Sequence, residues 1–216
     1  MDGADTTVVG TRWPSRAATG NRHEGMAMVA ALAADLCALD DRALVEACRA
    51  GRREAFDEIV VRHRRSLYQL CYRFVGNHAD ATDLTQELFL RAFRGLDKFK
   101  GEASVATWLY RIGVNLCLNK VGARALRTEP VEESHLPASR EPDAMSQLLE
   151  TERASRVRAA IAKLPKTQRA TLILRVYQEL PHQDIARVLD SSVGAVKANL
   201  FHALRNLRRL LQDGEP

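Results

Sequence analysis

The chain of 216 residues lacks the features by which several protein classes are recognised from sequence. No phosphate-binding glycine-rich loop occurs, and no metal-binding cluster accompanies the closely spaced acids in the way that a catalytic site requires. No uninterrupted apolar run approaches the ~20 residues that span a bilayer. We therefore expect a cytoplasmic protein that is not an enzyme and that needs no cofactor or metal.

Cysteine is scarce, and its spacing argues against a metal site. The cysteines lie far apart, with no Cys-x-x-Cys pair and no histidine at metal-ligand spacing. Three of them occupy apolar positions of helical patterns, where cysteine usually packs as a small hydrophobe. Buried, reduced thiols are the preferred interpretation; a zinc site or a redox switch is the alternative. The residues are Cys37, Cys48, Cys71 and Cys117.

Acidic residues are absent from 191–212, a stretch that carries several cations. The net charge of +5 and the pI near 9.2 are too modest to establish a polyanion partner by themselves. The local charge is more informative, because a helix without acids can lie against phosphates. Its basic residues are Lys197, Arg205, Arg208 and Arg209.

Apolar residues recur at three- and four-residue steps along most of the chain, and no stretch alternates with period two. This pattern predicts an all-α fold with two small helical domains on a flexible linker. The expected divisions are a largely disordered tail over 1–39, a first domain over 40–122, a linker over 123–144 and a second domain over 145–213. Helical periodicity begins only near Met26, and the sequence leaves open whether Met1 or Met26 is the true start.

The second domain contains the pattern of a helix-turn-helix. A short helix over 183–189, a turn over 190–192 and a long basic helix from Val193 follow one another, and Ser192 can cap the long helix. Its expected buried stripe is Val196, Leu200, Leu204 and Leu207. Its candidate DNA-facing residues are Lys197, Asn199, Phe201, His202 and Arg205. The alternative is a solvated basic helix.

The first domain combines an acidic helix with a basic, aromatic segment. Asp80, Asp83 and Glu87 share one helical face, which is either solvated surface or a partner site. Residues 99–104 form a short loop with a base and a glycine, of the kind that can hold an unstacked base. Trp108, on the next helix, is expected to be partly buried.

The order of these parts resembles the bacterial sigma factors of the extracytoplasmic-function type. The motifs similar to sigma region 2 are AFDEIVVR at 55–62, DLTQELFLRAF at 83–93, FKGEAS at 99–104 and TWLYRIGVN at 107–115. Those similar to region 4 are LP at 164–165, QDIA at 183–186 and SVGAVK at 192–197. The resemblance covers roughly residues 40–211.

The resemblance implies an alternative sigma factor that directs core RNA polymerase to the promoters of a stress or envelope-response regulon. The implied contacts with the polymerase clamp coiled coil come from Asp80, Asp83, Leu84, Gln86, Glu87 and Arg91. Those with the −10 element come from Phe99, Lys100, Gly101, Glu102, Ser104, Trp108, Arg111 and Asn115. Those with the −35 element come from Ser192, Lys197, Asn199, Phe201, His202, Arg205 and Arg208.

Further partners follow from the same resemblance. They are the polymerase flap and an anti-sigma factor that could hold the protein at the membrane.

The sequence departs from the family at Val105 and Ala106, where aromatic residues are common, and at Pro181, where a capping Ser or Thr is usual. It also departs at Ala198, Asn199 and His202, so the −35 preference of a relative cannot be transferred.

Two other functions remain open from the residues alone. A self-sufficient DNA-binding regulator would use only the helix-turn-helix, although no dimerisation heptad or effector domain is evident. A decoy that imitates a sigma factor would capture an anti-sigma factor without supporting transcription.

Overall fold

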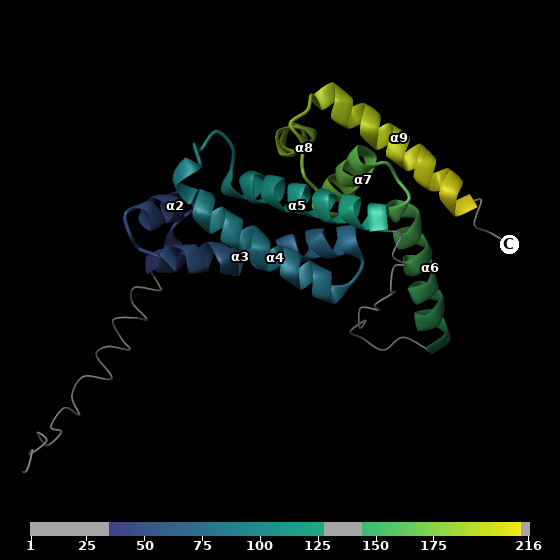
Figure 1. Cartoon of the computed structure of the whole chain (residues 1–216), viewed down its shortest axis with the longest axis horizontal. Coiled ribbons are helices and arrows are strands. Elements are labelled where there is room, and N and C mark those ends of the chain that lie inside the picture. The colour runs from purple at the N-terminus through teal and green to yellow at the C-terminus, as the bar shows by residue number, and fades with distance from the viewer. Residues whose placement is uncertain (1–34, 128–143, 213–216) are drawn as a thin grey trace, which may run out of the picture. The chain divides into compact units, whose positions relative to one another are not determined.

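The computed structural model describes residues 35–127 and 144–212, and these residues form helices and turns without a strand. The predicted all-α fold is confirmed (Figure 1). Most of the predicted tail and linker lies outside the described residues. The helices are α2 (Asp41–Arg49), α3 (Glu54–Val75), α4 (His78–Gly95), η1 (Leu96–Lys98), α5 (Val105–Arg127), α6 (Ala144–Ala162), α7 (Lys166–Leu172), η2 (Ile173–Tyr177), α8 (His182–Leu189) and α9 (Val193–Gln212).

Local capping chemistry explains where these helices begin. The first backbone amides of a helix have no partner within it, and short polar side chains satisfy them. Asp40 accepts from the amide of Ala43 at 2.7 Å, as predicted. Ser104 and Ser192 accept from the amides three residues ahead, both at 3.1 Å, which confirms those caps. Pro181 makes no side-chain cap hydrogen bond at the start of α8.

The N-terminal helical group consists of α2 to α5. Helices α3, α4 and α5 pack side by side around a core that includes Leu70, Leu88 and Leu109, each fully buried (Figure 1). Gly113 of α5 allows the close approach, because a Cβ there would lie 2.8 Å from Leu88 Cδ1. Gly76 ends α3 with φ of 78°, in the left-handed region that glycine adopts without strain.

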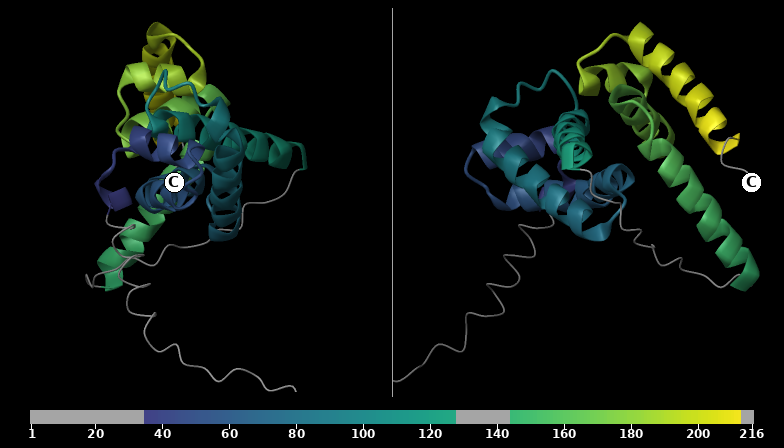
Figure 2. Two further views of the ribbon diagram at one scale, coloured as in Figure 1. Left: turned by 90° about the vertical axis from the view of Figure 1, so that its left-hand side faces the viewer. Right: turned by 45° about the vertical axis from the view of Figure 1, so that its right-hand side comes forward.

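The C-terminal helical group consists of α6 to α9. Ile185 and Ala186 of α8 are buried, as the helix-turn-helix pattern predicts, and α8 contacts α9. The turn between them passes through Asp190, whose φ of 50° is unusual for a residue other than glycine but tolerated by Asp. Helix α9 also contacts α6 and α7 (Figure 2).

Three details differ from the sequence prediction. Of the expected buried stripe of α9, Val196 is buried and Leu200 and Leu207 are half-buried, but Leu204 is 49% exposed, and Ala203 beside it is buried instead. Helix α5 runs to Arg127, five residues past the expected end of the first domain. Residues 35–38, placed in the predicted tail, are helical.

The cysteines divide into two kinds. Cys71 and Cys117 are fully buried and hydrogen-bonded to each other, in agreement with packed thiols. The hydrogen bond from Cys71 and burial raise the pKa of Cys117 well above its ordinary value. Cys37 is exposed and Cys48 half-buried. Across residues 35–127 and 144–212, no group of metal-binding side chains is assembled.

None of the helices within the described ranges has both the length and the apolar character needed to cross a membrane.

Candidate nucleic-acid and polymerase interface

The loop over residues 99–104 is held in place by Arg49, a residue of α2 that is distant in sequence. One guanidinium nitrogen of Arg49 donates to the carbonyl oxygens of Leu96 at 2.9 Å and Asp97 at 3.4 Å, and also to that of Phe99. This nitrogen carries two N–H groups, so at least one of them is shared between two of the three carbonyl oxygens. The entry to the loop is therefore fixed to α2, while Gly101 with φ of 73° forms its turn.

Phe99 anchors the loop rather than presenting an aromatic surface. It is 8% exposed, and its ring lies 5.0 Å from that of Trp108 of α5. Trp108 is half-buried, as predicted. Of the predicted −10 residues, the structure therefore leaves Lys100, Glu102, Ser104, Arg111 and Asn115 on the surface, while Phe99 packs inward.

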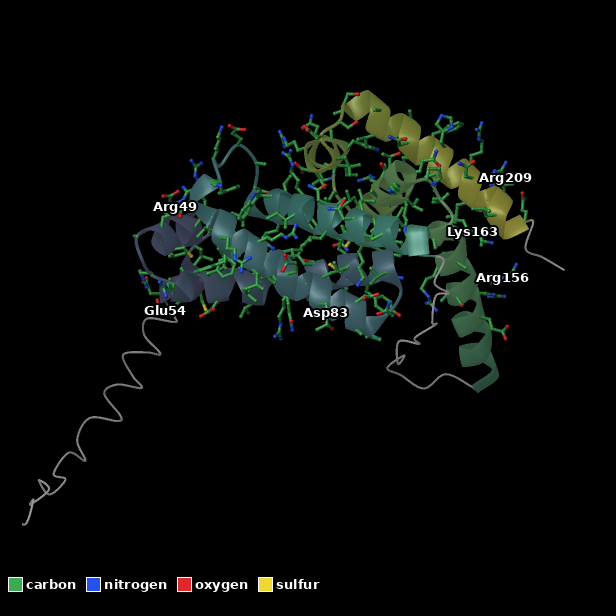
Figure 3. All side chains as sticks on the ribbon, in the orientation of Figure 1. Arg49, Glu54, Asp83, Arg156, Lys163 and Arg209 are labelled. Atoms are coloured by element: carbon green, nitrogen blue, oxygen red, sulfur yellow. The ribbon has the colours of Figure 1, made fainter. Side chains whose placement is uncertain are left out.

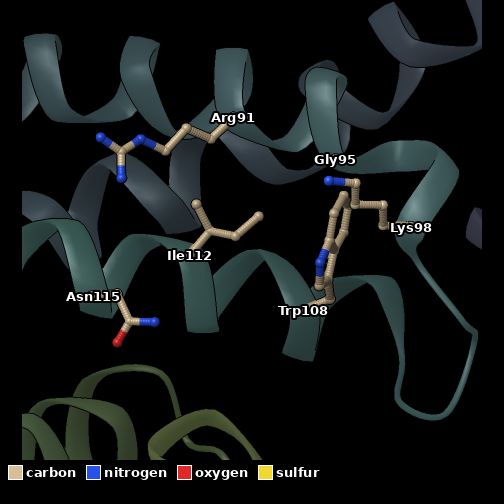
Figure 4. Close-up of a pocket in the computed structure, with 6 residues that line it drawn as sticks. All are labelled: Arg91, Gly95, Lys98, Trp108, Ile112 and Asn115. Atoms are coloured by element: carbon tan, nitrogen blue, oxygen red, sulfur yellow. The ribbon is translucent and has the colours of Figure 1, made fainter.

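A cavity opens beside Trp108, between α4 and α5. Its volume is 330 Å³, within the usual range for sites that hold small organic groups. Figure 4 shows Arg91 reaching from α4 toward the space over Ile112, with Trp108 at one end and Asn115 at the other. A planar base could stack on the indole and hydrogen-bond to the Asn115 amide, which can both donate and accept. The residues that line this cavity are Arg91, Gly95, Lys98, Trp108, Ile112 and Asn115.

A second, larger cavity of 570 Å³ continues from this one onto the loop. The two share Lys98, Trp108, Ile112 and Asn115. Arg187 and Asp190 of the helix-turn-helix also line the larger cavity. Cations outnumber acids around it, which suits an anionic ligand such as a nucleic-acid backbone.

The predicted acidic face of α4 is only partly open. Asp80 faces α5, where Lys120 approaches it to 2.8 Å, and it accepts from Asn77 at 2.8 Å. Leu84 is buried. Asp83 and Gln86 are exposed (Asp83 is labelled in Figure 3), and Glu87 pairs with Arg91 at 2.7 Å.

The same helix carries apolar surface that the sequence did not single out. Leu90 and Phe93 are exposed by 51% and 46%. They follow Asp83, Gln86 and Glu87 at helical spacing, so an acidic surface continues into an apolar one on α4. Such a combination is typical of a protein-binding helix.

The long helix α9 presents most of its predicted DNA-facing residues to solvent. Lys197, Phe201 and Arg205 are exposed, as are Ser192 and Arg208, whereas Asn199 and His202 are half-buried. Phe201 is 64% exposed, and its ring packs edge-on against that of His202 at 5.6 Å. Apart from the capping Ser192, the exposed set therefore consists of three cations and one aromatic ring at helical spacing.

Comparison with known proteins agrees with this arrangement. The Sigma-70 region 2 family model matches residues 59–127, and the Sigma-70 region 4 model matches residues 154–207. The chain is 33% identical to the RNA polymerase sigma-H factor of Pseudomonas aeruginosa, covering 80% of this chain and 94% of that protein. It is 32% identical to the ECF RNA polymerase sigma-E factor of Haemophilus influenzae, and this match covers 81% of this chain and 96% of that protein.

The chain is an ECF sigma factor. Solved structures support the fold assignment. The structure of CnrH in complex with the cytosolic domain of CnrY aligns with a TM-score of 0.62 at 26% identity, covering 81% of this chain and 99% of CnrH. The sigma factor RpoE of Bartonella quintana, solved with the anti-sigma factor NepR, aligns with a TM-score of 0.59 at 19% identity. The alignment covers 74% of this chain and 98% of that chain. Region 2 of this sigma factor thus corresponds to the N-terminal helical group, and region 4 to the C-terminal group.

Several residues at these surfaces escaped the sequence analysis. Arg49 resembles any basic residue in the last turn of a helix, so its role in fixing the loop had no signal in the sequence. Arg187 and Asp190 reach the region 2 cavity only because α8 packs against α5. The exposure of Leu90 and Phe93 could have been expected from a helical wheel, which places them beside the acids.

Replacing Arg49 by alanine in this sigma factor is expected to loosen the loop. Hydrogen bonds to a charged donor contribute about 1.5–3 kcal/mol, so amide hydrogen exchange over residues 98–104 should accelerate by roughly 10- to 100-fold. Exchange mass spectrometry measures this directly. Arg64→Ala, at an exposed position of α3, serves as the matched control; equal exchange in the two variants would contradict the assignment.

Proposed function

We propose that this ECF sigma factor binds core RNA polymerase, recognises −10 and −35 promoter elements and initiates transcription of a stress or envelope-response regulon. It would act in the cytoplasm. The observation that carries the proposal is the cavity lined by Trp108 and Asn115, beside the loop over residues 99–104 in region 2. A DNA-binding protein that uses only a helix-turn-helix has no need of such a site.

Each surface has its own part in the proposed reaction. The exposed acids and apolar residues of α4 would dock on the polymerase clamp coiled coil. The 330 Å³ cavity would take a base extruded from the −10 non-template strand, with stacking on Trp108 and hydrogen bonds to Asn115. Helix α9 would enter the −35 major groove, where its cations meet base edges and phosphates.

An anti-sigma factor is the proposed regulator. The relative CnrH was solved bound to a second protein, the cytosolic domain of CnrY. Exposed Phe201 and Leu204 offer surface for such a partner or for the polymerase flap. A cavity beside them is lined by Leu204, Leu207 and Leu211 together with Arg208 and Gln212.

The decisive experiment is transcription in vitro with core polymerase on genomic fragments, followed by mapping of the start sites. Asn115→Ala is expected to leave polymerase binding unchanged and to reduce permanganate-reactive thymines at −10, because it removes the amide that would hold the extruded base. Asn119→Ala, an exposed asparagine one helical turn along α5, is the matched control. A wild-type chain that binds core enzyme yet starts no transcript would refute the proposal and favour a decoy.

A further inference from the structure

Arg91 of α4 lines the 330 Å³ cavity beside Trp108. The resemblance implied a contact with polymerase for this arginine, together with Asp83 and Glu87. Figure 4 instead shows its guanidinium over the cavity, at the same end as Asn115 but on the opposite wall. The side chain is 52% exposed, so a ligand in the cavity can reach it. Arg91 is therefore placed to contact the group that this cavity would hold.

Glu87, one turn earlier on α4, holds the guanidinium of Arg91 by a single nitrogen. Its carboxylate accepts from Arg91 Nε at 2.7 Å. Among the described residues Arg91 has no further hydrogen-bond or ion-pair partner, so both terminal nitrogens, with two N–H groups each, remain available. The exposed pair contributes little to stability. Its consequence is an oriented fork of donors at the wall of the cavity.

The other walls of the cavity supply a stacking surface and a second polar group. A Cβ at Gly95 would lie 3.5 Å from Cζ2 of Trp108, so the missing side chain of Gly95 leaves the space beside the indole open. Asn115 is exposed, and its amide has no hydrogen-bond partner among the described residues. Lys98 is a second cation, and none of the described lining residues is acidic. The cavity therefore suits a planar group that is rich in acceptors.

The two polar walls differ in their hydrogen-bonding chemistry. Arg91 only donates, and its planar fork matches two acceptors that lie side by side, whereas Asn115 both donates and accepts. An unstacked base offers its Watson–Crick and Hoogsteen edges. Guanine has the adjacent acceptors O6 and N7, and cytosine has O2 and N3, but adenine and thymine have no two acceptors side by side on these edges. The fork therefore favours guanine and cytosine.

We infer that Arg91 is a specificity-determining residue of the −10 site and selects guanine or cytosine as the extruded base. A base stacked on Trp108 would direct its two acceptors to Arg91 and a remaining polar group to Asn115. Glu87 is the positioning residue that holds the fork at the cavity. The inference rests on the proposed function for the presence of an extruded base, while the choice of base comes from the guanidinium.

The test measures the affinity of the holoenzyme for promoter DNA whose −10 non-template strand is single-stranded. Each position of that strand carries the four bases in turn, and fluorescence anisotropy gives the affinity. At one position the unmodified chain should prefer guanine or cytosine by about tenfold, as a bidentate contact provides. Arg91→Ala should remove this preference and leave the other positions unchanged. Arg91→Lys should lose it too, because an ammonium group lacks the planar fork.

Two controls isolate the contact. Arg65→Ala removes an exposed cation from α3 and should keep the base preference of the unmodified chain. At the selected position, 7-deazaguanine or 3-deazacytosine lacks one of the two adjacent acceptors. The analogue of the preferred base should weaken binding by the unmodified chain and have no such effect on Arg91→Ala. All variants should bind core polymerase as tightly as the unmodified chain, since Arg91 faces the cavity.

Each outcome decides the inference. Loss of core binding in Arg91→Ala would overturn it in favour of the polymerase contact that the resemblance implied. A base preference that survives in Arg91→Ala or in Arg91→Lys would also overturn it, as would a preference for adenine or thymine at every position of the unmodified chain. Failure of the proposed function looks different: the unmodified holoenzyme itself would bind the −10 strand without any base preference.

Discussion

Reversing the charge of both Asp83 and Glu87 to lysine is expected to abolish association with core RNA polymerase. These acids lie on the outer face of α4, so the change places two cations where the proposed docking surface needs anions. Like charges brought together at an interface cost several kcal/mol, which lowers the affinity by at least ~100-fold. Fluorescence anisotropy of the labelled chain titrated with core enzyme measures the loss.

The control for this experiment reverses two other acids of region 2. Glu54 and Asp57 lie on the first turn of α3, and both are exposed. Glu54→Lys with Asp57→Lys changes the net charge by the same amount and should retain polymerase binding. Circular dichroism should show helical content unchanged in both double variants. Equal loss in the two would mean that only the net charge matters, and that α4 is not the docking surface.

Removing Lys197 and Arg205 together is expected to eliminate specific recognition of the −35 element. Both are exposed on α9, which contains no acid; Lys197 lies in its second turn and Arg205 in its fourth. Each contact to a base edge or phosphate contributes about 1–3 kcal/mol, so Lys197→Ala with Arg205→Ala should weaken holoenzyme binding by roughly 30-fold or more. Footprinting of the −35 region at several salt concentrations measures both the affinity and the number of phosphate contacts.

Two exposed cations of region 4, Arg153 of α6 and Lys163 directly after that helix, provide the matched control. Arg153→Ala with Lys163→Ala removes the same charge from region 4 without touching α9 (Lys163 is labelled in Figure 3). This variant should footprint like the unmodified chain, and both should bind core polymerase equally well. A similar loss in the control would point to a general electrostatic effect rather than to contacts made by α9.

Local interactions were readable from the sequence because they depend on neighbours along the chain. The caps at Asp40, Ser104 and Ser192 each bond to the amide three residues ahead, and Gly76 ends α3 by its own backbone freedom. The order of helices followed from apolar periodicity for the same reason. Helix α5 runs on to Arg127, past the expected end of the first domain at 122.

Exposure was harder to predict, because it depends on which helix packs on which face. Periodicity placed Leu204 in the buried stripe of α9, yet α9 meets α6, α7 and α8 along a face that leaves Leu204 in solvent. Phe99 was placed among the −10 contacts, but its ring packs against Trp108 and is buried. Asp80 was grouped with the open acids, but Lys120 of α5 engages it.

The sequence by itself determined that this chain is an all-α sigma factor, since helical periodicity and the family's motifs are local patterns in the order of residues. Only the tertiary structure decided which of the expected residues reach solvent, that Arg49 fixes the loop, and that Arg169 and Asp190 bring region 4 onto region 2. Those contacts join residues separated by up to 95 positions. No local propensity encodes such a pairing, because it exists only once the helices have packed and excluded water from between them.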